Sequence, residues 1–223
     1  MYHAFQLYEP ADAAKILERV KSLEFEDGRL TAGPLAVQRK KNRQVTKGEP
    51  LRKLRETLLQ DMLRHPGLSG FALPRRFSLP IANLYGPGEE YGPHVDAARM
   101  AGLDGLPIRT DLSYTLFLSD LASYDGGALC FQIAGQQMKV RLDSGQMIVY
   151  PSTLIHSVEP VTRGERYCVV GWIESMVHDL EARNLLFRLD LFCQLIHGKL
   201  AGEPAIAEEG TAIYQGFLRA LAR

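Results

Sequence analysis

Between Phe71 and Ser175 the chain changes from helical periodicity to a series of short apolar runs separated by glycine, proline and aspartate. Several runs are enriched in aromatic and β-branched residues, which favour strands. Asp125-Gly126-Gly127 and Asp143-Ser144-Gly145 are good turn sequences. Short strands at regular spacing, joined by turns, are typical of a β-sandwich or barrel. The sequence therefore predicts an all-β centre.

Helical patterns lie on both sides of this centre. Apolar residues recur at helical spacing after Pro10 and over Leu51–Arg64, and Pro66-Gly67 ends the second of these helices. An apolar series over Leu180–Ile196 and a shorter one over Thr211–Ala222 predict two further helices. We therefore expect a mainly β fold with flanking helices.

The expected organisation is one domain in three parts. An N-terminal helical and strand flank covers residues 1–76, a β core covers 77–178 and a C-terminal helical flank covers 179–223. The apolar C-terminal helices either cover the core or pair with a second subunit. We expect the second arrangement, a homodimer, because most soluble oligomers are symmetric pairs of one chain.

Charge and cysteine usage exclude several classes of protein. The 223 residues contain 26 basic and 26 acidic side chains, so the net charge is zero. A protein that binds nucleic acid or an anionic membrane through phosphates needs a basic face, and we expect neither partner. Cys130, Cys168 and Cys193 are scattered without CxxC pairs, no run of about 18 apolar residues occurs, and the first residues do not resemble a signal peptide. These features indicate a reduced, cytoplasmic protein.

A basic run, Arg39–Arg43, interrupts the N-terminal flank. It is compatible with a solvated loop or with a loop that faces the substrate, and the sequence leaves its role open.

The main chemical signal is the tripeptide His94-Val95-Asp96. Alternate side chains of an extended strand point to one face, so His94 and Asp96 share a face and Val95 points the other way, into apolar packing. A single strand can thus present an imidazole and a carboxylate to one cation. A third ligand must come from elsewhere, and His156 is the best candidate because its segment can re-enter the sheet. Two histidines and one carboxylate form the facial triad of non-haem Fe(II) oxygenases, which leaves coordination positions open for a co-substrate and O2.

Polar residues on two other predicted strands support this interpretation. Arg166 opens the apolar strand Arg166–Ile173, where a guanidinium is costly to bury without an anion. It suits recognition of a carboxylate through two parallel hydrogen bonds. Asn83 and Tyr85 share a face of another strand, and the tyrosine hydroxyl can donate a second hydrogen bond to the same carboxylate.

An ordered set of motifs resembles one enzyme family. The stretch from residue 77 to 190 resembles the PKHD-type hydroxylases, bacterial relatives of the prolyl 4-hydroxylase branch of Fe(II)/2-oxoglutarate dioxygenases. The motifs that carry this resemblance are Asn83-Leu84-Tyr85, His94-Val95-Asp96, Arg109-Thr110-Asp111-Leu112-Ser113, Tyr124-Asp125-Gly126-Gly127, Tyr150-Pro151-Ser152, the run His156–Arg166, Trp172–Val177 and Leu185–Asp190.

The resemblance implies a fold, cofactors and site residues. It implies a double-stranded β-helix (jelly-roll) core, with iron on His94, Asp96 and His156. It further implies that Arg166 pairs with the distal carboxylate of 2-oxoglutarate, helped by Tyr85, and that L-ascorbate keeps the iron reduced. The neighbouring Asn83 is included with the residues expected to bind the co-substrate. The implied reaction is hydroxylation of an unactivated C–H with O2, in which 2-oxoglutarate is decarboxylated to succinate.

The substrate is the least constrained part. Kinship with prolyl hydroxylases suggests an amino-acid or peptidyl substrate, and a small natural product is equally compatible. Arg109 and Asp111 either touch a polar substrate at the mouth of the site or form a structural ion pair. The segments Ala97–Pro107 and Ala128–Gly135 differ from the family and are expected to border the substrate. Desaturation or cyclisation at the same iron, a zinc hydrolase, and a jelly-roll regulatory module that binds metal without turnover are the alternatives.

Overall fold

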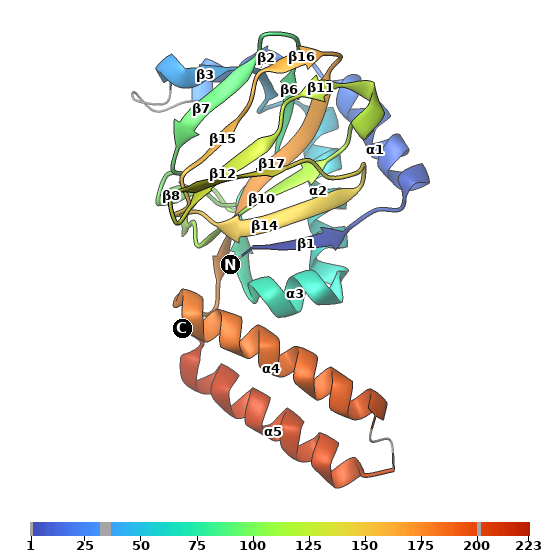
Figure 1. Ribbon diagram of the computed structural model, residues 1–223, viewed down its shortest axis with the longest axis vertical. Coiled ribbons are helices and arrows are strands. Elements are labelled where there is room, and N and C mark those ends of the chain that lie inside the picture. Colours follow the sequence, from blue (N-terminus) through green and yellow to red (C-terminus); the bar gives the residue numbers. More distant parts are fainter. Residues whose placement is uncertain (1, 32–36, 200–201) are drawn as a thin grey trace.

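The computed structural model describes residues 2–31, 37–199 and 202–223. In these residues the strands of the central region form two antiparallel sheets that pack face to face (Figure 1). The strands are β1 (His3–Gln6), β2 (Glu26–Asp27), β3 (Lys40–Lys41), β4 (Arg43–Val45), β5 (Pro74–Phe77), β6 (Ile81–Tyr85), β7 (Glu90–His94), β8 (Arg99–Ala101), β9 (Pro107–Arg109), β10 (Leu112–Phe117), β11 (Asp125–Gly126), β12 (Leu129–Ile133), β13 (Gln136–Val140), β14 (Gln146–Pro151), β15 (His156–Val158), β16 (Val161–Arg163) and β17 (Arg166–Ser175).

The larger sheet has the strand order β1-β14-β10-β17-β6-β4-β2, with β5 also paired to β17. The smaller sheet has the order β13-β12-β15-β7-β3, and two two-stranded sheets, β8–β9 and β11–β16, lie outside both. Neighbours in each sheet are mostly distant in sequence, as in a double-sheet jelly roll. The predicted fold class, a jelly-roll core with flanking helices, is confirmed.

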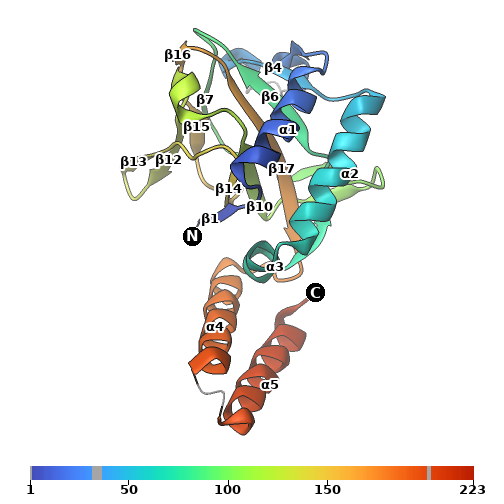
Figure 2. The ribbon, with the colours of Figure 1, turned by 90° about the vertical axis from the view of Figure 1, so that its right-hand side faces the viewer.

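Five α-helices accompany the sheets in the described residues: α1 (Pro10–Lys21), α2 (Glu49–Arg64), α3 (Pro66–Ala72), α4 (Leu180–Lys199) and α5 (Pro204–Leu221). The first two lie against the outer face of the larger sheet (Figure 2). The second predicted helix ends where expected, since α2 stops at Arg64 just before Pro66-Gly67, and a short further helix that the sequence did not predict begins at Pro66. The ring of His65 accepts a hydrogen bond from the Leu68 amide, 3.1 Å away, and caps α3, while Pro66 occupies its first turn.

Alternation along the central strand β17 separates two apolar layers. Tyr167, Val169 and Ile173 face the helices and belong to the main core, which α1 and α2 complete. Arg166 and Cys168 face the smaller sheet. Alternate side chains of this strand thus lie on opposite faces of the larger sheet, and the Arg166 guanidinium lies between the two sheets.

The N-terminal flank is part of the jelly roll rather than an appendage. Its strands β1, β2 and β4 join the larger sheet, and β3 joins the smaller one. The division of the chain at residue 76 remains an interpretation of the sequence.

The C-terminal helices α4 and α5 form an antiparallel hairpin that projects from the jelly roll below α3 (Figures 1 and 2). The base of this hairpin is anchored, since Phe187 packs edge-on against Phe71 at 5.2 Å and the Arg223 amide donates to the Met176 carbonyl at 2.9 Å. These helices do not cover the β core. In the described part of the chain, no helix has the length and apolar character needed to cross a membrane.

Candidate active site

Pairing of β7 with β15 brings the two predicted histidine ligands together. The register places His94 directly opposite His156, although 61 residues separate them in the chain. Directly opposed residues of an antiparallel pair project to the same face of the sheet. Their ring centroids are accordingly 4.2 Å apart.

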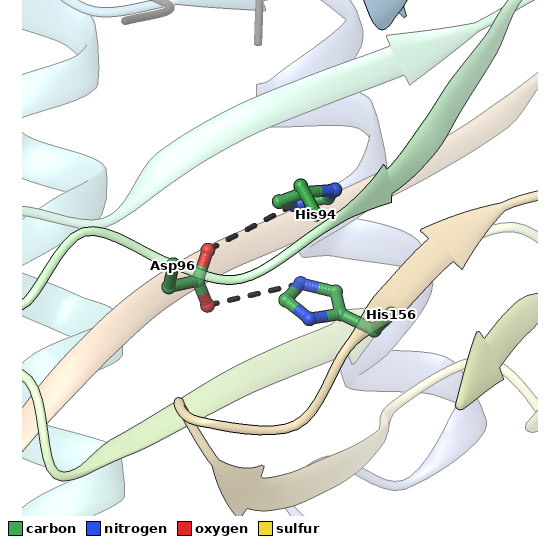
Figure 3. Close-up of side chains that lie close together, drawn as sticks. All are labelled: His94, Asp96 and His156. Carbon is green, nitrogen blue, oxygen red and sulfur yellow. Dashed lines mark ion pairs between the residues drawn. The ribbon is translucent and has the colours of Figure 1, made fainter. Parts of the chain in front are cut away.

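Asp96 reaches the histidines from beyond the end of the strand (Figure 3). Because β7 ends at His94, the next residue is no longer held in the sheet. The expectation that Val95 points into apolar packing is therefore wrong: 54 % of Val95 is exposed, and it lies at the rim of the cavity described below. The Asp96 carboxylate nevertheless lies on the same side of the chain as the two imidazoles.

The three side chains form a compact donor set. Asp96 Oδ1 lies 3.9 Å from His94 Nε2, and Asp96 Oδ2 lies 3.7 Å from His156 Nε2 (Figure 3). Two donors that bind one ion at about 2.1 Å each cannot be more than about 4.2 Å apart, so both distances fit a shared cation. Within the described residues this group could hold a metal ion.

Backbone carbonyls orient both rings. His94 Nδ1 lies 2.9 Å from the Gly92 carbonyl, and His156 Nδ1 lies 2.9 Å from the Leu154 carbonyl. A carbonyl can only accept, so each Nδ1 carries the proton and each Nε2 keeps its lone pair. Outer hydrogen bonds of this kind fix the tautomer and ring orientation of histidines that bind metals.

Two serines orient the carboxylate in the same way. Ser113 Oγ donates to Asp96 Oδ2, and the same hydroxyl lies 2.7 Å from Ser152 Oγ. Both serines are buried; Ser113 lies in β10, and Ser152 directly follows the adjacent strand β14. The larger sheet thus supports the carboxylate and the smaller one supplies the imidazoles.

Burial keeps His94 in the form that a metal requires. Desolvation, together with the neighbouring His156, lowers the pKa of His94 to about 4. The ring of Tyr91 stacks on His94 with centroids 3.7 Å apart, and Lys40 Nζ lies 5.3 Å from the Tyr91 centroid. Burial also lowers the pKa of Lys40 to about 8.

The triad opens into a cavity of about 370 Å³ between the two sheets, and Arg166 lines the same cavity. The guanidinium is 1 % exposed and lies over the rings of Tyr85 and Phe117, 5.3 and 5.0 Å from their centroids. Its Nη1 donates to Cys168 Sγ at 3.0 Å. Its Nε and Nη2 have no hydrogen-bond partner among the described protein atoms. Two buried, unpaired donors on one cation fit an anionic ligand in the cavity.

Tyr85 and Asn83 take different positions in this wall. Burial raises the pKa of Tyr85, so its hydroxyl remains protonated and can donate a hydrogen bond. Asn83 lines the cavity, but its side-chain oxygen already accepts from Asn42 at 2.8 Å and from Gln44 at 2.6 Å. Asn83 therefore organises its neighbours, and its direct contact with a co-substrate remains a prediction.

Arg109 and Asp111 pair with each other. Two hydrogen bonds of 2.7 and 2.8 Å join them, and the Ser175 amide donates to the same carboxylate at 2.8 Å. The Asp111 side chain is 3 % exposed. Neither residue is among the described residues that line the cavity. The geometry matches the ion-pair interpretation, and contact with a substrate remains a prediction.

Sequence reasoning missed several residues of the site. Tyr91 and Ser113 carry no signal of their own, because their roles depend on which strands pair. Lys40 was visible only as part of the basic run: it is 5 % exposed and lines the cavity, whereas Arg43 pairs outside it with Glu89. Both segments expected to border the substrate contribute to the lining, through Met100 and Leu129.

Comparisons with known proteins agree with this geometry. The sequence profile of the 2OG-Fe(II) oxygenase superfamily matches residues 81–174. A PKHD-type hydroxylase of Janthinobacterium sp. (strain Marseille) is 40 % identical over 202 residues, which cover 90 % of this chain and 89 % of that protein. A crystal structure of a Pseudomonas putida prolyl-4-hydroxylase matches with a TM-score of 0.55 at 22 % identity, covering 78 % of this chain and 92 % of that one. HygX from Streptomyces hygroscopicus, solved with nickel and 2-oxoglutarate, matches with a TM-score of 0.58 at 13 % identity over 79 % of this chain and 84 % of that one.

The jelly roll and its histidine–carboxylate cluster define an oxygenase that depends on Fe(II) and 2-oxoglutarate. The chain belongs to the PKHD-type hydroxylase family of these enzymes. It is accordingly a 2-oxoglutarate-dependent hydroxylase.

Proposed function

We propose that His94, Asp96 and His156 bind the catalytic Fe(II) and that Arg166 binds the distal carboxylate of 2-oxoglutarate. The observation that carries this proposal is the buried guanidinium with two unpaired nitrogens, in the same cavity as the donor set. A structural ion pair would satisfy such a cation within the protein. Metal-binding donor atoms and a cation with unpaired hydrogen-bond donors in one cavity suit a metal ion and a dicarboxylate that bind together.

The donor set fits ferrous iron. Two neutral imidazoles and one carboxylate form a facial triad, a ligand set typical of non-haem Fe(II), with positions left for a co-substrate and O2. When bound, Fe(II) and 2-oxoglutarate supply the oxidising chemistry: one atom of O2 enters the substrate C–H bond, the other enters succinate, and CO2 leaves.

The chain's own residues bind, orient and exclude water. The carbonyls of Gly92 and Leu154 hold the two imidazoles with Nε2 free, and Ser113 holds the carboxylate. Arg166 and the protonated hydroxyl of Tyr85 anchor the far end of the co-substrate, which fixes its orientation along the cavity. Apolar residues such as Val158 and Val170 also line the cavity, and an apolar lining strengthens the attraction between a carboxylate and the guanidinium.

The proposed substrate is an amino acid, a peptidyl side chain or a small natural product that is hydroxylated at an unactivated C–H. Support comes from the prolyl-4-hydroxylase among the structural neighbours and from the size of the cavity, which exceeds the needs of 2-oxoglutarate. The lining adds an ammonium, Lys40, and apolar groups such as Met100.

Two further features of the working enzyme are proposed. L-Ascorbate would restore Fe(II) after turnover without substrate, as the family resemblance implies. The enzyme would act in the cytoplasm, since its three cysteines are free and buried, the usual state in a reducing compartment.

The test is conversion of 2-oxoglutarate to succinate in air by the Fe(II)-loaded protein, with the His156→Ala variant as the control. Succinate should form with the parent chain and not with the variant, and ascorbate should prolong the activity. Absence of succinate, or equal amounts from both proteins, would favour a zinc hydrolase or a module without turnover. A mass-spectrometric screen of cell extract then identifies the substrate: a gain of 16 mass units denotes hydroxylation, whereas a loss of two denotes desaturation or cyclisation.

A further inference from the structure

The C-terminal hairpin places small side chains between its two helices and large apolar side chains on its exposed surface. Where its helices approach each other in their distal halves, the residues are small: Cys193 and Ala207 are buried, and a Cβ added at Gly210 would lie 3.4 Å from Cys193 Sγ. Large apolar side chains point outward instead. Seven of them are between 44 % and 59 % exposed: Leu185, Leu191, Phe192, Leu195, Ile206, Ile213 and Phe217.

The outward residues of the two helices lie on one side of the hairpin. Successive helical residues are rotated by about 100° around the helix axis. Leu185 and Phe192 each come one position before an α4 residue that faces α5, so they point about a quarter turn away from α5. Ile213 and Phe217 have the same offset from the α5 residues that face α4. Because the helices are antiparallel, equal offsets bring both stripes to the same side. We call this surface the hairpin face; it comprises Leu185 and Phe192 of α4 and Ile206, Ile213 and Phe217 of α5, and Leu191 and Leu195 extend it around α4.

The size of the hairpin face is that of a protein interface. Taking about 180 Å² for each fully exposed large apolar side chain, the five residues of the hairpin face expose about 470 Å², and Leu191 and Leu195 add about 180 Å² around α4. The largest apolar patch on a typical monomer is about 300–600 Å², and a standard interface buries about 800 Å² on each partner. Together with Leu191 and Leu195, the exposed apolar area approaches the area that one partner buries in a stable dimer, so we expect another surface to cover it.

Charge identifies the cover. The helix α4 carries one more basic than acidic side chain, and α5 carries one more acidic than basic. The hairpin is therefore neutral, unlike the lysine- and arginine-rich helices that lie on anionic membranes. A two-fold axis that lies in the interface and runs along the helices places α4 of one copy against α5 of the other, where their opposite net charges attract. A two-fold interface also requires a self-complementary surface, and a flat apolar hairpin face meets this requirement.

We infer that this face is covered by the same face of a second copy of the chain, so that two hairpins form a four-helix bundle. Bundles of this kind bury apolar stripes of antiparallel helices around one core. The described residues that line the cavity come from the jelly roll and none from the hairpin, so the dimer does not complete the active site. Assembly and catalysis are thus separable.

The test is the mass of the full chain in solution, by light scattering or sedimentation equilibrium. The parent protein should have twice the monomer mass of 24.9 kDa. Phe217→Glu and Phe192→Glu should each raise the dimer dissociation constant by at least about 30-fold, because each places a charge in the apolar core of the bundle. The control Gln215→Glu adds the same charge at an exposed position on the opposite flank of α5 and should leave the dimer intact.

Retention of the helical circular dichroism signal and of 2-oxoglutarate turnover by the Phe217→Glu variant would confirm that the change acts on assembly alone. A monomeric parent chain, or a dimer that is insensitive to both glutamates, overturns the inference. A monomer that binds neutral or anionic phospholipid vesicles through Phe217 would instead identify a lipid surface as the cover, and a monomer that gains mass only with a different protein would identify that protein.

Discussion

Replacement of Arg166 by methionine tests the account of the co-substrate pocket through two opposite effects. The guanidinium is 1 % exposed, donates to Cys168 Sγ, and has two nitrogens without a partner among the described protein atoms. In the ligand-free protein these unpaired donors lower the stability of the folded state. With a carboxylate in place, the same nitrogens become paired. Arg166→Met should therefore weaken ligand binding and stabilise the empty fold.

The magnitudes follow from those two atoms. Each buried unpaired donor costs about 1–3 kcal/mol, so a carboxylate that pairs both gains about 2–6 kcal/mol. At 1.4 kcal/mol per factor of ten, the affinity for 2-oxoglutarate should fall by about 30-fold to about 10⁴-fold. Methionine fills most of the same volume without a charge, and such replacements of buried ions stabilise folds by up to about 4 kcal/mol. Each 1 kcal/mol corresponds to about 2–4 °C in melting temperature for a chain of this size.

Two assays separate the effects. Calorimetric titration of 2-oxoglutarate into the Fe(II)-loaded protein without oxygen gives the affinity, and thermal melting of the metal-free, ligand-free protein gives the stability. Arg163→Met is the matched control, because that arginine is 61 % exposed and pairs with Asp125 on the surface. It should change neither value by much. An unchanged affinity for 2-oxoglutarate in Arg166→Met, or a metal-free variant that melts below the parent, would refute the reasoning.

Three further predictions concern the surroundings of this pocket. Ser113→Ala removes the donor that orients Asp96 and should lower Fe(II) affinity by about 10- to 100-fold, measured by metal titration; an unchanged affinity would remove Ser113 from the support of the site. Asp111→Asn should lower the free energy of unfolding by about 2 kcal/mol, which is less than for a fully buried ion pair because Arg109 is 39 % exposed. It should leave the affinity for 2-oxoglutarate unchanged. A selective rise in the KM for the substrate would instead support a substrate contact. In the metal-free protein, the pKa of His94 near 4 lies below the ordinary value of 6.5, so the folded state takes up a proton less readily than the unfolded one. The contribution of neutral His94 to the free energy of unfolding is complete above about pH 6.5, and up to about 3 kcal/mol of it is lost as the pH falls towards 4. Chemical denaturation at several pH values should show this decrease, and the His94→Gln variant should show a smaller one. A free energy of unfolding that does not change over this pH range would contradict the prediction.

Only part of the site follows from local geometry. The two-residue repeat of a strand puts Arg166 on the face that lines the cavity, wherever β17 pairs. The approach of Asp96 to the histidines does not follow from this repeat, because β7 ends at His94 and pairing with β15 supplies His156. The position of Val95 could not be predicted, since it depends on where β7 ends. That end is set by pairing with β15, which the local sequence does not show.

Other parts of the molecule depend on contacts that sequence patterns do not encode. Lys40 looked like one member of a solvated basic run, but its two-residue strand β3 pairs with β7 and turns the side chain into the cavity. The apolar periodicity of the C-terminal helices predicted their existence. It left open whether they would cover the core, because periodicity shows that a face is apolar and not what lies against it.

The central claim is that His94, Asp96 and His156 hold Fe(II) beside a bound 2-oxoglutarate. The most direct measurement is the visible absorption spectrum of the protein after addition of Fe(II) and then 2-oxoglutarate without oxygen. Chelation of the iron by the 2-oxo acid should produce a charge-transfer band that saturates at one equivalent of each. The same additions to His94→Ala or His156→Ala should produce none. Absence of the band from the parent chain, or an equal band in both variants, would contradict the claim.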